Sequence, residues 1–201
     1  NRAIKGTFDG NNYTISNIYI KSNKSNQGLF GAIANATIKN IIIDNSVIEG
    51  TNNVGVISRN SANAIIENIH TTKNNIIKAT STNGVAYVGG IIGNATGIQI
   101  SKVSNYATVI GNGAYIGGIV GAAHKDSHIS ESYNAGNVKA YENKSNIFSI
   151  GGIIGTNAWN VEIINCYNIG TIEGYNAIGG ISGSAHAYPM LTITNCYNIG
   201  T

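Results

Sequence analysis

The feature that most constrains this chain is a short glycine-rich unit that returns about every 30 residues. The unit is clearest as Gly-Gly-Ile-Ile-Gly at 89–93 and 151–155. We align its last position at Gly31, Ser58, Gly93, Gly121, Gly155 and Gly183, with intervals of 27, 35, 28, 34 and 28 residues. No repeat carries apolar residues at the i, i+3, i+4 and i+7 spacing of a helix. The period therefore predicts a β-solenoid in which each repeat is one coil.

The composition agrees with this fold class. Isoleucine (36 residues), asparagine (31) and glycine (26) dominate the 201 residues, and there is one proline. β-Branched residues favour strands, whereas Gly and Asn favour turns. We predict an all-β parallel β-solenoid of about six coils that forms a single domain over 1–201. Residues 1–27 would be an initial partial coil and 28–201 the repeated coils. Because the chain starts and stops within the pattern, we expect a fragment of a larger protein.

Each coil is expected to contain three short strands whose apolar positions recur and point inward. The first strand is the glycine-rich unit, with a middle column of Leu29, Val56, Ile91, Ile119, Ile153 and Ile181. The second starts at Ile38, Ile66, Ile100, Ile129, Ile163 and Ile193. The third has a column of Val47, Val109, Val138 and Ile172, which Ile76 joins only after a one-residue shift.

Two connections are longer than the rest and the start of the chain differs. Residues 77–88 and 140–150 lengthen the link between the third strand and the next glycine-rich unit, and loops on one edge of a solenoid are common binding elements. Ile4-Lys5-Gly6 matches the third strand. Asp-Gly-Asn-Asn at 9–12 is a strong turn signal between two strand-like runs.

These motifs resemble a known family. Phe-Asp-Gly-Asn-Asn-Tyr-Thr-Ile-Ser-Asn-Ile at 8–18, Gly-Leu-Phe-Gly at 28–31 and the later Gly-Gly-Ile-Ile-Gly units are similar to the GLUG-motif family of bacterial surface and secreted proteins. The unit at 54–58 departs from the motif because it loses the final glycine. The resemblance implies an extracellular, adhesin-like protein or a non-catalytic region of an IgA-specific metalloendopeptidase. Residues 9–15, Asp-Gly-Asn-Asn-Tyr-Thr-Ile, also resemble the opening of right-handed β-helices of the pectin-lyase type, which implies a right-handed β-helix.

Two columns follow the second strand and carry side chains of interest. Asn105, Asn134, Asn168 and Asn198 are expected to form an internal hydrogen-bonded ladder. Tyr133, Tyr167 and Tyr197 lie one position earlier, preceded in their column by Ile42, His70 and Ser104. Strand alternation sends this tyrosine column outward. The rings could stack on one another, and they could also contact a ligand such as a sugar.

The candidates for chemistry are few. Cys166 and Cys196 share a column with apolar residues, so we expect buried free thiols. His124 and His186 occupy equivalent positions two coils apart, too far for one metal ion, and with His128 we expect exposed loop histidines. The acidic residues show no converging pair, calcium loop or His-Glu-x-x-His helix. We therefore predict no catalytic residue, metal or cofactor.

The partners and function follow from these patterns. The net charge is +3 and the basic residues are scattered, which disfavours nucleic acid. No apolar run is long enough for a membrane span. We expect a non-catalytic structural or adhesive segment that contacts a host glycan, an extracellular protein or flanking domains of its own chain. The alternatives are a substrate-recognition module of a secreted IgA-type metalloprotease and, less favoured, a β-helix enzyme that processes polysaccharide.

Overall fold

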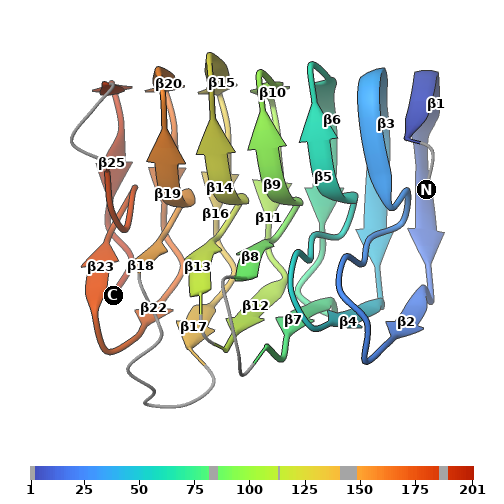
Figure 1. Cartoon of the computed structure of the whole chain (residues 1–201), viewed down its shortest axis with the longest axis horizontal. Coiled ribbons are helices and arrows are strands. Elements are labelled where there is room, and N and C mark those ends of the chain that lie inside the picture. Colours follow the sequence, from blue (N-terminus) through green and yellow to red (C-terminus); the bar gives the residue numbers. More distant parts are fainter. Residues whose placement is uncertain (1–2, 82–85, 113, 141–148, 186–189) are drawn as a thin grey trace.

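The computed structural model describes residues 3–81, 86–112, 114–140, 149–185 and 190–201, and these are all-β. The strands pair in parallel with their counterparts in the next repeat, so the chain forms the expected parallel β-solenoid (Figure 1). Within the described part of the chain, no helix is long and apolar enough to cross a membrane.

The strands divide into an N-terminal turn and six coils. The turn is formed by β1 (Ile4–Ser16) and β2 (Tyr19–Lys21), and coil 1 by β3 (Ala32–Asp44) and β4 (Val47–Gly50). Coil 2 contains β5 (Ser58–Ala62), β6 (Ile65–Thr71) and β7 (Ile76–Ala79). Coil 3 contains β8 (Ala86–Gly89), β9 (Ile92–Thr96), β10 (Gln99–Ser101), β11 (Ser104–Asn105) and β12 (Thr108–Gly111).

Coils 4 and 5 repeat the five-strand order of coil 3, and coil 6 has three strands among the described residues. Coil 4 contains β13 (Ala114–Gly117), β14 (Val120–His124), β15 (Ser127–Ser130), β16 (Tyr133–Asn134) and β17 (Val138–Ala140). Coil 5 contains β18 (Ser149–Gly151), β19 (Ile154–Ala158), β20 (Val161–Ile164), β21 (Tyr167–Asn168) and β22 (Ile172–Glu173). Coil 6 contains β23 (Ala177–Gly179), β24 (Leu191–Thr194) and β25 (Tyr197–Asn198).

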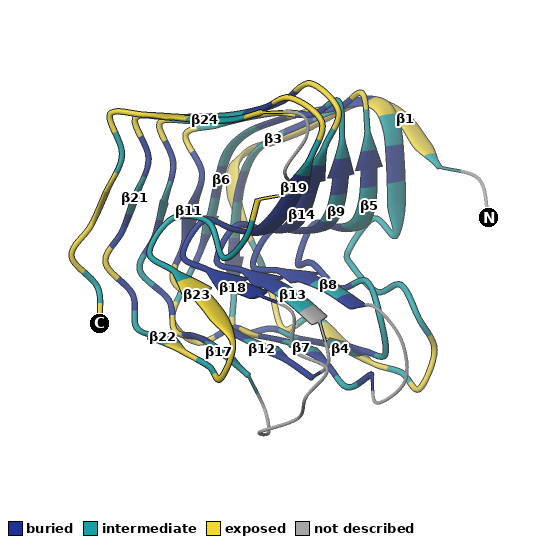
Figure 2. Ribbon diagram, turned by 60° about the vertical axis from the view of Figure 1, so that its left-hand side comes forward, coloured by how far each residue is buried: buried dark blue, intermediate teal, exposed yellow. Residues whose placement is uncertain are grey.

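The strands assemble into three parallel sheets that enclose one core. The largest has 15 strands because β3 and β6 continue through a corner of the coil, and the other two have six and four strands. Residues that face the interior are buried, and the exposed ones lie on the outer faces and the terminal turns (Figure 2).

The glycine-rich unit is a corner and not the single strand that the sequence suggested. β8 ends at Gly89 and β9 begins at Ile92, and the equivalent break recurs between β13 and β14 and between β18 and β19. A Cβ atom on Gly90 would lie 2.2 Å from the carbonyl oxygen of Gly118 in the next coil. A residue with a side chain could not sit at this position without the backbones of the two coils moving apart.

The second glycine of each pair also faces the predicted asparagine ladder, which the structure confirms. The Nδ2 atom of each asparagine donates to the Oδ1 atom of the next: Asn105 to Asn134 at 2.8 Å, Asn134 to Asn168 at 2.7 Å and Asn168 to Asn198 at 2.7 Å. A Cβ atom added to Gly152 would lie 2.6 Å from the Asn168 side chain. In coils 3 to 6 the second glycine of the pair and the ladder asparagine therefore pack directly against each other.

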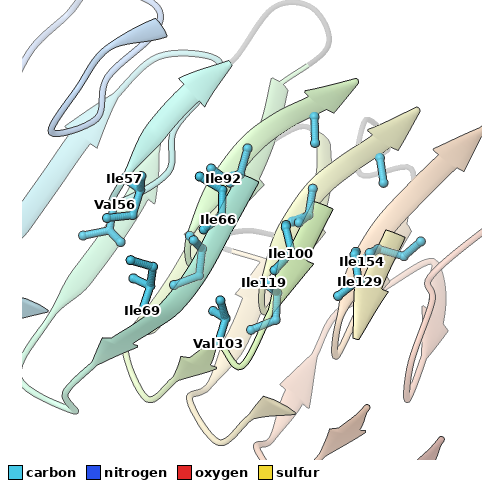
Figure 3. Packing of buried hydrophobic residues seen from close by; sticks show 14 of the residues in the cluster. Val56, Ile57, Ile66, Ile69, Ile92, Ile100, Val103, Ile119, Ile129 and Ile154 are labelled. Carbon is cyan, nitrogen blue, oxygen red and sulfur yellow. The ribbon is translucent and has the colours of Figure 1, made fainter. Parts of the chain in front are cut away.

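The core columns match the prediction in the second strand and differ in the third. Ile38, Ile66, Ile100, Ile129, Ile163 and Ile193 pair in one continuous column (Figure 3 shows part of this core). In the third strand, Ile48 and Ile77 occupy the buried column with Val109, whereas Val47 pairs with Ile76, which is 41% exposed. The prediction for Val47 was wrong because adjacent β-branched residues do not reveal which one points inward.

The register of the second coil also differs by one residue. Asn60 pairs with both Ala32 and Asn94, which places Arg59, and not Ser58, at the position of Gly31 and Gly93. Ile57 consequently replaces Val56 as the counterpart of Ile91. With Arg59 in place, the intervals become 28, 34, 28, 34 and 28 residues, a strict alternation.

The N-terminal turn corrects two further expectations. Ile4 pairs with Ile33 of β3, so the start of the chain does not belong to the third strand. Residues 9–12 do not reverse the chain, because β1 remains parallel to β3 on both sides of them. Asp9 pairs with Lys39 and Tyr13 with Ile41, so three residues of β1 lie opposite one residue of β3. Asn11 and Asn12 adopt positive φ angles in this bulge.

We predict that Gly152→Ala destabilises the fold by about 1–3 kcal/mol or more, since the new methyl group would overlap a backbone oxygen and the Asn168 side chain. Gly50→Ala is the matched control, because its Cβ atom would meet mainly the side chain of Gln27, which can move. Urea unfolding of both variants measures the difference. Equal losses would show that the close approach at Gly152 is not the cause.

We further predict that Asn168→Leu lowers the free energy of unfolding by about 1–3 kcal/mol for each buried polar group left without its partner. Asn168 is fully buried and bonds to Asn134, Asn198 and the Gly170 carbonyl. Asn137→Leu supplies the control, because Asn137 is exposed. An unchanged melting temperature for Asn168→Leu would argue against a stabilising ladder.

Candidate functional site

The tyrosine column is the most regular outward-facing feature of the coils, and its rings stack as one of the two predictions stated. The ring centroids of Tyr133 and Tyr167 are 4.7 Å apart with an interplanar angle of 3°, and those of Tyr167 and Tyr197 are 4.9 Å apart at 2°. Parallel pairing of β16, β21 and β25 sets this spacing. Tyr106 closes the N-terminal side of the stack, edge-on to Tyr133, with their hydroxyl oxygens 2.9 Å apart.

The stack limits how a ligand can use these rings. Both faces of Tyr167 are covered by neighbouring rings, whereas Tyr197 at the end of the stack is 51% exposed. The pKa of Tyr167 is raised by burial and by the adjacent tyrosines, so its hydroxyl stays neutral near pH 7. A ligand would therefore meet ring edges and hydroxyl groups along most of the column. Contact with a ligand stays a prediction for Tyr133, Tyr167 and Tyr197.

The same column changes chemistry toward the N-terminus. His70 lies next to Ser104, and its Nδ1 atom is 2.7 Å from the serine Oγ atom. Its Nε2 atom lies 2.9 Å from Oδ1 of Asn68. Burial lowers the pKa of His70, which favours the neutral ring. Both ring nitrogens thus bond to neighbouring side chains of the solenoid.

The two cysteines are free thiols, as predicted, and differ in exposure. Cys166 is fully buried, whereas Cys196 in the terminal coil is partly exposed. Burial raises the pKa of the Cys166 thiol to about 12. Its Sγ–H lies 3.3 Å from the Ile164 carbonyl oxygen. The thiolate needed for nucleophilic chemistry is therefore strongly disfavoured at Cys166.

The histidines do not lie in exposed loops as expected. His124 ends strand β14, is half-buried and lies edge-on to Tyr87, with ring centroids 6.1 Å apart. His128 is exposed but belongs to β15, and its Nδ1 atom is 3.0 Å from Oε2 of Glu162 in the next coil. His186 lies outside the described residues. Glu162 as the acidic partner of His128 was not predicted from the sequence.

Several acidic side chains pair with cations of adjacent coils. Glu49 lies 3.9 Å from both Lys21 and Lys78, and Glu67 lies 3.6 Å from Lys102. Ion pairs at a protein surface contribute about 0–1 kcal/mol each, and the partly covered pair of Glu49 with Lys78 is the least accessible of these. Within the part of the chain that the structure describes, no group of three or more His, Cys, Asp or Glu residues could hold a metal ion.

The two long connections are shorter than the sequence suggested. Strand β7 extends to Ala79 and β8 begins at Ala86, so much of 77–88 is strand. Ala140 ends β17, and Ser149 and Ile150 belong to β18. The remaining connecting residues 82–85 and 141–148 lie outside the described part of the chain.

One feature was not predicted from the sequence: the corner that follows β14 in coil 4 and β19 in coil 5 contains one residue more than the equivalent corner of coils 1 to 3. The last position of the glycine-rich unit precedes the second-strand isoleucine by seven residues in coils 1 to 3 and by eight in coils 4 and 5. The extra residue widens the corner between β14 and β15 and the corner between β19 and β20. It places Trp159 and Asp126 on the surface. The one-residue change in spacing was the available signal.

We predict that a thiol assay without reductant finds two reactive thiols per chain after unfolding. In the native state at pH 8 Cys196 should react first, because Cys166 is buried and its pKa of about 12 leaves little thiolate. Cys196→Ser should remove the fast phase. Finding no thiols in the unfolded chain would instead indicate a disulfide.

The fold and these surfaces can be compared with known proteins. No protein-family model matches the chain, so membership of the GLUG-motif family stays a prediction. A stretch of 96 residues, 47% of this chain, is 35% identical to halomucin of Haloquadratum walsbyi. An alignment over 166 residues, which covers 66% of this chain, shows 25% identity to the immunoglobulin A1 protease of Streptococcus sanguinis. The matched segments span 1% and 9% of those two proteins.

A solved structure shares the fold. The crystal structure of a candidate immunoglobulin A1 protease from Bacteroides ovatus superposes with a TM-score of 0.72 at 23% sequence identity. The superposition covers 95% of this chain and 59% of that one. The chain is thus a parallel β-solenoid distantly related to segments of halomucin and of immunoglobulin A1 protease proteins.

Proposed function

We propose that this solenoid is a non-catalytic structural and adhesive segment of an extracellular bacterial protein. In this role it holds binding surfaces at fixed spacing and contacts a glycan or a protein through its outer face. The observation that carries the proposal is the tyrosine stack of Tyr133, Tyr167 and Tyr197, which repeats a chemical group at 4.7 and 4.9 Å along the solenoid.

The packing supports a rigid spacer. Isoleucine columns and the asparagine ladder continue from coil to coil, so bending between coils would break buried contacts and hydrogen bonds. Each coil is covered by its neighbours, which is how a solenoid offsets the entropy of ordering short strands. A rod of this kind can keep an outward-facing surface in one orientation.

The tyrosine column supports recognition through hydroxyl groups and ring edges. Tyrosine combines an apolar ring with a donor and acceptor and has few rotatable bonds, so it loses little entropy on binding. Here the rings are already fixed by stacking, which lowers that cost further. A glycan or a protein surface offers the hydroxyl and carbonyl groups that would match this column.

The extracellular location rests on the relatives. Halomucin and immunoglobulin A1 protease share segments with this chain, and the second name denotes a protein that acts on an antibody. Proteins of these kinds operate outside the cell. The same relatives favour the second candidate, an accessory module of an immunoglobulin A1-type metalloprotease that contacts the antibody substrate. A polysaccharide-processing β-helix enzyme is the less favoured third candidate.

We predict that the chain binds a glycan or a protein in a screen of immobilised glycans, host extracellular proteins and immunoglobulin A1. The variant Tyr133→Ser/Tyr167→Ser should lose at least about tenfold in affinity, since it removes the central rings of the stack. Tyr175→Ser is the control, because Tyr175 is exposed and lies outside the stack. Circular dichroism of each variant confirms that the fold is retained.

The outcomes separate the candidates. Binding to immunoglobulin A1 alone would favour the accessory module, and glycan binding would favour the adhesive segment. Unchanged affinity of the double variant would overturn the role of the tyrosine column. Breakdown of a polysaccharide by the isolated chain would overturn the non-catalytic assignment.

A further inference from the structure

The widened corner of coils 4 and 5 has an unusual backbone. In coils 1 to 3 the corner contains a single residue with positive φ: Asn35, Asn63 or Gly97. Asn and Gly adopt this conformation readily. In coils 4 and 5 the corner contains two such residues, Lys125-Asp126 and Trp159-Asn160. Lys and Trp adopt positive φ less readily than Asn and Gly, although Lys102 and Glu131 also do so at another corner of the coils.

Trp159 is the most unusual of these residues. It is the chain's only tryptophan, its φ is +60° and its side chain is 60% exposed. Tryptophan is normally largely buried, and an exposed one next to polar groups is typical of binding surfaces. The indole therefore offers an apolar face to solvent at a fixed corner of the rod.

Polar side chains gather beside this indole. Two adjoining cavities of about 320 and 500 Å³ share Asp126 and Asn160. The larger is lined by Trp159 and Lys125, and the smaller by His128, Glu162, Met190 and Thr192. β15 and β20, which supply His128 and Glu162, are neighbours in the sheet (Figure 1).

Interactions between the two coils hold these groups in position. Nδ2 of Asn160 donates to Oδ1 of Asp126 at 3.2 Å, and His128 lies 3.0 Å from Glu162. Each carboxylate uses one oxygen in these contacts. The second oxygens, Oδ1 of Asn160 and Nε2 of His128 have no hydrogen-bond partner among the described residues. The cavities thus present donors and acceptors that are already oriented.

This chemistry matches a neutral sugar. One face of a pyranose ring carries C–H groups, which pack on the negative face of an indole, and its rim carries hydroxyl pairs. Carboxylates and amides can each bond to two such hydroxyls, and bonds to a carboxylate are strong. Two carboxylates beside one lysine disfavour anionic ligands such as phosphate and acidic sugars. The smaller cavity is within the size range of small-ligand sites.

We propose that the corner formed by Asp126, His128, Trp159, Asn160 and Glu162 is a binding site for one neutral sugar unit of a glycan. Trp159 is the stacking platform, and the four polar side chains select the hydroxyl pattern. This inference deepens the proposed recognition role and rests on it, but it concerns a different surface from the tyrosine stack, which lies on β16, β21 and β25.

The tryptophan makes the test direct, because its fluorescence reports from the site alone. The intact chain is titrated separately with galactose, N-acetylgalactosamine, N-acetylglucosamine, lactose and, as the anionic comparison, N-acetylneuraminic acid. We expect at least one neutral sugar to change the emission of Trp159 saturably at millimolar concentrations, and N-acetylneuraminic acid alone to change it at least about tenfold more weakly. No saturable change with any neutral sugar, or equal binding of N-acetylneuraminic acid, overturns the proposal.

Variants assign the contacts, with binding measured by ligand-observed NMR so that tryptophan can be replaced. Trp159→Ala and Glu162→Gln should each weaken binding about tenfold or more, whereas Trp159→Phe should retain most of it. Glu67→Gln is the matched control, because Glu67 lies on the outer face of β6 three coils from Glu162 and should leave affinity unchanged. Wild-type affinity in Trp159→Ala overturns the site.

The same titration separates this inference from the proposed function. Tyr133→Ser/Tyr167→Ser should leave the fluorescence response of Trp159 intact. A response that persists while that variant loses its screened partner supports two independent surfaces. If the double variant keeps its fold but loses the fluorescence response, the two surfaces are not independent, and the sugar binds at the tyrosine stack instead.

Discussion

The contact on which the rest of coils 3 to 6 depends is that between the second glycine of a pair and an asparagine side chain of the same coil. Gly90, Gly118 and Gly152 meet Asn105, Asn134 and Asn168 in this way. The glycine lets the next coil approach, and the approach brings successive asparagines within hydrogen-bond distance. Where the ladder position holds Thr71, the preceding unit holds Val56 in place of the second glycine. The two motifs therefore change together.

The sequence predicted the parts of the fold that repeat as columns. The isoleucines of the second strand, the asparagine ladder and the tyrosine stack each recur at one fixed offset, so their alignment required only the period. The corners were harder, because a glycine pair is compatible with a strand and with a turn. Val47 and Ile48 are similar in size and branching, and a shift of one residue exchanges the buried and the exposed face.

The candidate surfaces divide in the same way. The tyrosine stack was visible because three copies of Asn-x-Tyr-Asn-like sequence follow one another, and its geometry follows from strand spacing. The Trp159 corner could not be predicted from the sequence, because its residues come from two coils and do not recur at the same offset in the other coils. The sequence signal for it is that the interval from the glycine-rich unit to the second-strand isoleucine grows from seven to eight residues. This interval can be related to a site only when the pairing of Glu162 with His128 is known.

The asparagine ladder gives the rod a direction. Every rung donates from Nδ2 to the next Oδ1 toward the C-terminus, so the amide dipoles of Asn105, Asn134 and Asn168 point the same way. Aligned hydrogen bonds polarise one another and strengthen together. An asparagine in the middle of the ladder accepts one such bond and donates another. Asn198 accepts a bond from Asn168, but its own Nδ2 atom donates to the Gly200 carbonyl and not to an asparagine of the described chain. The aligned side-chain amides thus give the interior of the solenoid a dipole along its axis. The two ends of the ladder differ chemically, although the isoleucine columns around them are the same.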